Sequence, residues 1–486
     1  TTAGNSSNRY ELAQLSYVYR VNYSYDNRYL IELNGRYDGT SRFMKDQRWN
    51  FFPSFSLGWN VARENFWKPL ESVVNQFKLR GSWGELGNQN TSNLYPFYEI
   101  LPVKSNSGNW LVNGGKTNTA DIPSLVSTLL TWERVRSFNV GFDFGAFSNR
   151  LTGSFDYFVR KTVDMVGPAP QLPLVLGIAP AIVNNADMKS YGFEIELSWR
   201  DRIGEVDYGV KFNLADAQQK VVKYPNTTNA FSDWYAGKMS GEIWGYTSLG
   251  IAKTDEEMKE HLASLPNGGQ NQLGNKWGAG DIMYADINGD GKIDGGKGTL
   301  ADPGDQRIIG NSTPRYNFGL VLDASYKGFD VSIFFQGVGK RDYAPIVGTN
   351  GAVFWGAVNN IWQSMAMEEH FDYFRPEGHP MGANLNGYYP RPDFTSNKNH
   401  QVQTRYLQDA SYIRLKNLQI GYTLPKQWIN KLHINRCRVY VSGDNLWTGT
   451  SLASMFDPET LAAGDWGSGK TYPLSKVISF GLNVNF

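Results

Sequence analysis

The strongest candidate for chemistry in this sequence is a run of alternating oxygen-bearing residues that reads DINGDGKID. The candidate ligands occupy every second position, as Asp286, Asn288, Asp290, Lys292 and Asp294. This spacing matches the opening of an EF-hand-like calcium loop, in which a glycine permits the sharp turn. The twelfth position departs from that pattern, because Lys297 stands where a calcium loop has an acid. A turn held by its own Asn and Asp hydrogen bonds is the alternative, and both interpretations give the loop a structural role.

No other set of residues in the chain indicates catalysis. Glu194 and Glu196 resemble a carboxylate pair, but two residues apart on a predicted strand they line one wet face. The sequence has no nucleophile elbow or P-loop, and the single Cys437 permits no internal disulfide. The histidines lack metal-ligand spacing; they are His261, His370, His379, His400 and His433. We therefore expect no enzyme activity and no catalytic cofactor, with calcium as the one candidate ion.

Tryptophans in the long stretches between predicted strands are candidates for ligand or partner contacts. Exposed aromatic rings can stack on sugars or meet a partner protein. Packing inside folded loops is an equally good explanation. The residues concerned are Trp234, Trp244, Trp277, Trp355 and Trp362.

The composition of the 486 residues excludes two classes of protein. The 47 Lys and Arg residues nearly balance 46 Asp and Glu residues without a long basic run, so nucleic acid has no electrostatic footprint. No window approaches the 18 or more apolar residues of a membrane-spanning helix. Aromatic residues are nevertheless 14% of the chain while mean hydropathy is −0.43. This mixture is typical of a wall with one apolar and one wet face.

Strict period-two alternation recurs along the whole chain and predicts β-strands whose two faces meet different solvents. In residues 186–200, for example, Phe193, Ile195 and Leu197 alternate with Glu194 and Glu196. The pattern predicts strands at 10–25, 28–40, 51–61, 76–85, 131–144, 150–163, 186–200, 205–218, 313–326, 328–340, 408–422, 435–447 and 474–486.

Tight turns and long loops alternate between these strands. Turns fall at 26–28, 148–149, 201–204 and 327–328, whereas loops rich in Gly, Asn, Pro and Trp cover 86–130, 164–185, 219–312, 341–407 and 448–473. Short turns on the periplasmic rim and long extracellular loops are typical of outer-membrane barrels. The sequence thus predicts an all-β fold, an antiparallel transmembrane β-barrel with long extracellular loops. Thirteen is an odd count, so we expect further strands upstream of Thr1 or on another chain.

Short motifs recur in a fixed order along the chain. They are DGTSRF at 38–43, RWNFFPS at 48–54, LRGSWG at 79–84, DINGDGKID at 286–294, RIIGN at 307–311, YKGFD at 326–330, SYIRLKN at 411–417 and VSGDNL at 441–446. In this order and spacing they resemble the SusC/RagA family of TonB-linked outer-membrane proteins of Bacteroidetes. The final strand, ending in Phe486, also resembles the assembly signal of such barrels.

The resemblance implies a barrel of about 22 strands, of which residues 1–486 supply roughly the last 13. An N-terminal plug and the first strands would then lie outside this chain, as would the region that contacts the TonB complex. A SusD-like surface lipoprotein is the implied partner, alongside outer-membrane lipid. Compared with the family's pattern, the calcium loop carries an insertion at about 295–302, which makes Asp305 its closing carboxylate.

The function that we expect is TonB-dependent import, across the bacterial outer membrane, of a large nutrient such as an oligosaccharide or peptide. A SusC-like structural scaffold within a larger envelope complex is the alternative, and a passive diffusion channel is a third hypothesis. A soluble β-rich enzyme ranks last, because no catalytic constellation is found.

Overall fold

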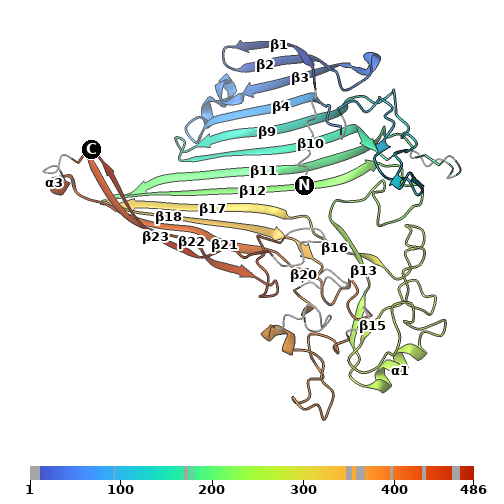
Figure 1. The fold of residues 1–486 in the computed structure, drawn as a ribbon. Coiled ribbons are helices and arrows are strands. Elements are labelled where there is room, and N and C mark those ends of the chain that lie inside the picture. Colours follow the sequence, from blue (N-terminus) through green and yellow to red (C-terminus); the bar gives the residue numbers. More distant parts are fainter. Residues whose placement is uncertain are drawn as a thin grey trace. The chain divides into compact units, whose positions relative to one another are not determined.

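Thirteen long antiparallel strands dominate the computed structural model, and each hydrogen-bonds to its neighbour in the order β1-β2-β3-β4-β9-β10-β11-β12-β17-β18-β21-β22-β23 (Figure 1). The structure describes residues 11–91, 94–168, 173, 175, 177–178, 180–345, 353–356, 367–393, 398–429, 434–461 and 471–486. Apart from short strands inside loops, the sheet order follows the chain order. The predicted all-β antiparallel fold is confirmed.

Each predicted strand corresponds to one strand of this sheet. The largest boundary error is at β12, which was predicted to end at residue 218 and ends at Lys223. The observed strands are β1 (Gln14–Tyr25), β2 (Tyr29–Thr40), β3 (Trp49–Asn60), β4 (Val74–Asn88), β9 (Glu133–Ala146), β10 (Leu151–Gly167), β11 (Val183–Ile203), β12 (Val206–Lys223), β17 (Arg315–Tyr326), β18 (Phe329–Lys340), β21 (Tyr412–Thr423), β22 (Arg436–Thr450) and β23 (Val477–Asn485).

The chain divides into two compact units. The first comprises residues 1–193, 219–228 and 233–238, and the second comprises residues 194–218, 229–232 and 239–486. Within the described residues, every helix is too short or too polar to cross a membrane.

The first unit is built around the wall strands β1 to β10. Alternate side chains of β1 and β2 put Tyr17, Tyr19 and Leu33 on one exposed face, where Tyr19 lies opposite Gly35. A Cβ atom at Gly35 would lie 2.1 Å from the Tyr19 ring, so the ring covers the glycine and stacks near Phe51 at 6.2 Å. The aromatic alternation that predicted these strands therefore produces one continuous apolar face.

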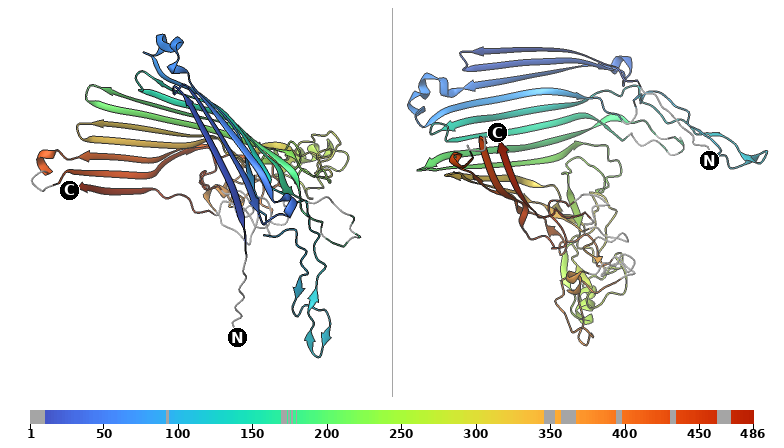
Figure 2. Two further views of the ribbon diagram at one scale, coloured as in Figure 1. Left: turned by 90° about the horizontal axis from the view of Figure 1, so that it is seen from above. Right: turned by 60° about the vertical axis from the view of Figure 1, so that its left-hand side comes forward.

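The two ends of these wall strands carry different connections. At one end, the predicted turn at 26–28 joins β1 to β2, and the 3-10 helices η2 (Val61–Arg63) and η3 (Asn65–Leu70) connect β3 to β4 beside it. At the other, the chain between β4 and β9 forms a projecting hairpin, seen in cyan in Figure 2. Its short strands pair as β5 (Val103–Lys104) with β8 (Thr119–Ala120) and β6 (Leu111–Val112) with β7 (Gly115–Lys116). Short and long connections thus lie at opposite strand ends, as the turn pattern predicts.

The second unit combines wall strands with a folded loop body. Three connections build this body, those between β12 and β17, between β18 and β21, and between β22 and β23. Its elements are β13 (Glu242–Gly245), β14 (Ser248–Ile251), α1 (Asp255–Ala263), β15 (Ile282–Tyr284), β16 (Arg307–Asn311), β19 (Asp342–Tyr343), η6 (Glu368–Phe371) and β20 (Gln408–Asp409). A short helix, α3 (Lys426–Ile429), precedes β22.

A mostly aromatic core joins the three connections of the loop body. Phe354 and Ile282 are fully buried in it, and rings from distant parts of the chain meet edge to face. Such a core resembles that of a soluble domain. Its buried members are Tyr246, Leu265, Ile282, Tyr284, Ile293, Tyr343, Phe354, Trp355, Tyr389, Tyr406, Ala410, Leu452, Phe456 and Leu461.

Candidate functional site

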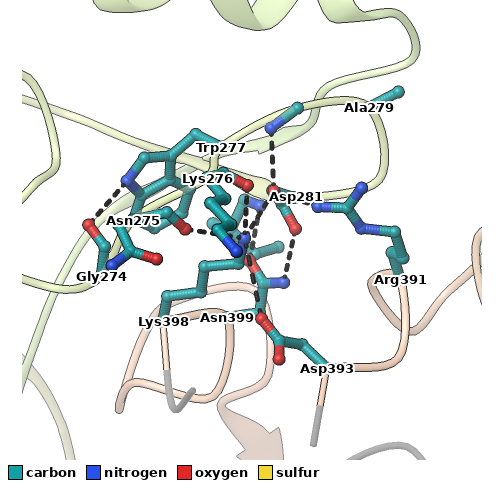
Figure 3. A network of polar contacts seen from close by, with 12 residues as sticks. Gly274, Asn275, Lys276, Trp277, Ala279, Asp281, Arg391, Asp393, Lys398 and Asn399 are labelled. Atoms are coloured by element: carbon teal, nitrogen blue, oxygen red, sulfur yellow. Dashed lines mark hydrogen bonds and ion pairs between the residues drawn. The ribbon is translucent and has the colours of Figure 1, made fainter. Parts of the chain in front are cut away.

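A buried ionic network fixes two long connections of the loop body to each other (Figure 3). The Asp281 carboxylate is fully buried and accepts hydrogen bonds from Lys398 Nζ at 2.9 Å and Arg391 at 2.8 Å. Asn399 donates to its other oxygen at 2.9 Å. Because both charges of the Asp281–Lys398 pair are out of water, each depends on the other for compensation.

The same network positions the backbone around it. Lys398 Nζ also donates to the carbonyl oxygens of Asn275 and Lys276, at 3.3 and 3.0 Å, and lies 5.1 Å from the centre of the Trp277 ring. The Tyr284 hydroxyl donates to the Lys398 carbonyl at 2.7 Å, and burial raises the pKa of that hydroxyl well above its usual value. The geometry makes this network a clamp between loops rather than an acid/base site.

Sequence reasoning missed this clamp. Asp281 comes just before the calcium-like motif, and Lys398 and Arg391 lie more than a hundred residues further along the chain. Charged residues in an aromatic-rich, glycine-rich stretch were the available signal, but one sequence does not show which charges meet.

The calcium-like loop has the backbone shape of an EF-hand opening. Gly291 takes the sixth position with φ of +78°, and its N–H donates to Asp286 at 2.8 Å. Asn288 Oδ1 accepts from the backbone N–H of Asp290 at 3.0 Å, and Asp290 accepts from that of Lys292 at 3.2 Å. These bonds are the Asx-type contacts of the alternative interpretation, so the geometry is compatible with both.

Asp305, which the sequence analysis predicts as the closing carboxylate, lies against this loop. Asp305 is fully buried, and its oxygens accept backbone hydrogen bonds from Ile287 at 2.8 Å and Asp294 at 2.9 Å. Burial raises the pKa of Asp305, and the neighbouring charge of Asp286 adds to the rise. A cation there would relieve the charge of both carboxylates.

The ammonium group of Lys292 lies closest to Asp294 among the candidate ligands, and Asp290 is further away at 3.8 Å. The Nζ to Oδ2 distance is 2.5 Å, and this hydrogen bond lowers the pKa of Asp294. In the described part of the chain, no three His, Cys, Asp or Glu side chains are grouped so that they could hold a metal ion. Any cation would therefore rely on Asp286, Asp305 and neutral oxygens.

The candidate tryptophans differ in exposure. Trp355 is 1% exposed in the core, Trp277 packs against that core, and Trp244 stacks on Phe231 at 4.6 Å. Trp234 is 41% exposed, with Lys238 Nζ 5.7 Å from its ring centre. Trp362 lies outside the described residues. Of the candidate tryptophans that the structure describes, Trp234 is therefore the one best placed to contact a ligand.

The polar face of the wall in the first unit carries a second concentration of charge. Arg80 on β4 donates to Asp143 on β9 at 2.8 Å and to Asp156 on β10 at 2.7 Å. A pocket of about 550 Å³ lies on this wall, and its mixed lining includes Arg80, Lys78 and Glu32 beside Leu30. A wet, charged face opposite an apolar one is the arrangement expected of a channel lumen.

Comparison with known proteins is decisive for the family. Residues 1–446 match the family described as TonB dependent receptor-like, beta-barrel. The chain belongs to the TonB-dependent receptor β-barrel family. It is 30% identical to the TonB-dependent receptor P3 of Formosa agariphila, covering 96% of this chain and 45% of that protein. It is 25% identical to the TonB-dependent receptor SusC of Bacteroides thetaiotaomicron, covering 97% and 44%.

Solved structures agree on the fold of this receptor barrel. The RagAB peptide transporter superimposes with a TM-score of 0.73 at 22% identity, covering 98% of this chain and 48% of that one. The chain spans slightly less than half the length of the relatives it matches. The predicted SusC/RagA-type membership and outer-membrane location of the TonB-dependent receptor barrel are confirmed.

Proposed function

We propose that this receptor barrel provides the lumen wall and extracellular loops of a TonB-dependent importer of a large nutrient, an oligosaccharide or peptide. The observation that carries the proposal is family membership over residues 1–446. A relative named SusC and a similar structure described as a peptide transporter support import by a barrel that works together with a second protein. The receptor character of these relatives also favours a non-enzymatic role.

The partners follow from the same proposal. A SusD-like lipoprotein would cover the loop body from outside, and the TonB complex would act through a region beyond these residues. Ligand would be held between loops, plug and lipoprotein, and the charged lumen face around Arg80 would line its path. The loop clamp keeps two of the connections together, so that they present one surface to ligand or lipoprotein.

Uptake in cells tests import directly. We would delete the full-length gene, complement it, and measure accumulation of labelled oligosaccharide and peptide pools with and without a functional TonB system. Uptake that needs both the gene and TonB supports the proposal. Uptake that needs the gene but not TonB would indicate a passive channel, and a defect in envelope assembly without any uptake defect would indicate a scaffold.

We further propose that the loop at 286–305 takes up a calcium ion for structural purposes. Asp286 and Asp305 would provide the charge, with Asn288, Asp290, Lys292 and Asp294 contributing to the loop that surrounds it. The EF-hand-like turn and the buried Asp305 carboxylate support this. Extracellular calcium modules bind with Kd of about 10⁻⁴–10⁻³ M.

Calcium titration of the full-length protein in detergent, followed by hydrogen exchange, tests the ion. We expect added calcium to slow exchange in 286–305 of the wild type and of Asp302→Asn, and to leave Asp305→Asn unaffected. Asp302 is the matched control because it is an acid of the inserted segment. No calcium-dependent protection in the wild type would leave the Asx turn as the explanation.

A further inference from the structure

An apolar groove of about 500 Å³ runs across one face of the last four wall strands, all within the second unit. Its side-chain lining comes from β18, β21, β22 and β23. It is made by Phe329, Ile420, Tyr422, Val439, Val441, Phe480 and Leu482.

Strand register shows why a groove forms there. Val439 lies between Tyr422 and Leu482 on the neighbouring strands, and Val441 lies between Ile420 and Phe480. Two short valines on β22 are thus flanked by larger side chains on β21 and β23. The valines form the floor of the groove and the larger side chains form its walls.

This face of the strands is the one that meets membrane. Ile420, Val439 and Val441 are 53%, 42% and 42% exposed, although they are apolar and lie on strands with a neighbour on each side. Residues one position away point to the opposite face, where Arg438 forms an ion pair with Asp330. In an outer-membrane barrel, the exposed apolar face contacts hydrocarbon and the charged face lines the lumen.

The groove lies near the end of the strands that carries the short turn. Lys327 belongs to the turn that precedes Phe329, and α3, with Lys426 and Trp428, lies at the same end as the C-terminus (Figure 1). Trp428 is 64% exposed. Tryptophan, tyrosine and basic side chains at this depth are typical of the interface between hydrocarbon and headgroups.

We propose that the groove binds one acyl chain of a phospholipid from the periplasmic leaflet, with the phosphate of its headgroup beside Lys426. The occupant is a lipid because the groove opens on the face that hydrocarbon covers. The exposed ammonium group of Lys426 provides a positive charge that attracts a phosphate. Lys327 already pairs with Glu205 at 2.7 Å, which leaves Lys426 as the stronger candidate.

The test is native mass spectrometry of the full-length protein, released from nanodiscs of phosphatidylethanolamine and phosphatidylglycerol. We expect one retained phospholipid on the wild type. Val439→Trp should fill the groove floor and reduce its occupancy about tenfold, which corresponds to about 1.4 kcal/mol. Val21→Trp, at an exposed position of β1 outside the groove, is the matched control and should retain the lipid.

A second variant tests the placement of the phosphate beside Lys426. Lys426→Gln should reduce phospholipid retention about fivefold. Equal retention by the wild type and Val439→Trp, or no lipid on the wild type, would overturn the proposal. Loss with Val439→Trp but not with Lys426→Gln would keep the acyl chain in the groove and overturn the placement of the phosphate.

Discussion

The wall of the first unit and the loop body of the second unit are stabilised in different ways. Wall side chains such as Ile31 and Tyr19 remain exposed on the folded strands, which are held together by backbone hydrogen bonds between neighbours. Loop-body residues such as Ile282 and Phe354 are fully buried. A wall strand therefore depends on lipid and on neighbouring strands, whereas the loop body depends on its own dry core.

The largest difference should be between an ion pair of the loop body and one of the exposed hairpin that connects β4 to β9. Lys398→Met leaves the buried Asp281 carboxylate without its closest ammonium, and such losses cost about 3–5 kcal/mol. Lys104→Met removes an exposed pair with Asp121 in the hairpin, for which about 0–1 kcal/mol is expected. Hydrogen exchange of the full-length protein in nanodiscs would measure both. Equal effects would contradict the distinction between a dry loop body and a wet hairpin.

Two isoleucines give a matched comparison of packing. Ile282→Ala opens a cavity in the loop-body core and should cost about 2–4 kcal/mol. Ile31→Ala on the outer face of β2 leaves no cavity, because lipid fills the space, and should cost less than about 1 kcal/mol. Protease resistance of the extracellular loops checks the first variant, and heat-dependent gel mobility of the folded barrel checks the second. A cavity-sized effect at Ile31 would mean that this face is packed against protein.

Alkaline pH should lower the stability of the loop body, by less than the substitutions above. Burial raises the pKa of Tyr343 to about 12, and burial also raises the pKa of Tyr389, Tyr406 and Tyr284. A raised folded-state pKa gives stability that is complete below the ordinary value of 10.0 and is lost as pH rises through the folded value.

Limited proteolysis across pH 10 to 12 checks this prediction. The loop body should become cleavable over this range while the wall stays protected, and Tyr343→Phe should shift the onset of cleavage to higher pH. Cleavage of wall and loops together would show that they unfold as one unit.

The sequence predicted the wall far better than the loop body, for a physical reason. Each wall strand has one apolar and one polar face, so apolar and polar residues alternate along it. Neighbours such as Phe193 and Glu194 therefore show in the sequence which face each side chain occupies. The loop body is determined by contacts over long separations, as between Asp281 and Lys398, which leave no local period. The calcium-like turn is intermediate, because its spacing is local but Asp305 is placed by an insertion that only the family pattern revealed.

Two arginines, each bridging two carboxylates, test the smallest expected effect. Arg80 joins Asp143 and Asp156 on the lumen face with 32% of its side chain exposed, whereas Arg414 joins Asp457 and Glu459 with 4% exposed. Water screens the first set, so Arg80→Gln should cost about 1 kcal/mol or less. Added salt should recover part of this loss by screening the two aspartates that remain.

Arg414→Gln should cost several times more and respond little to salt, because its carboxylates lose a buried partner. Thermal unfolding of the full-length barrel at low and high salt would measure both variants. A salt-insensitive loss for Arg80→Gln as large as that for Arg414→Gln would mean that the polar face of the wall is sealed from water. A lumen face packed in that way could not serve as the path of a nutrient without first rearranging.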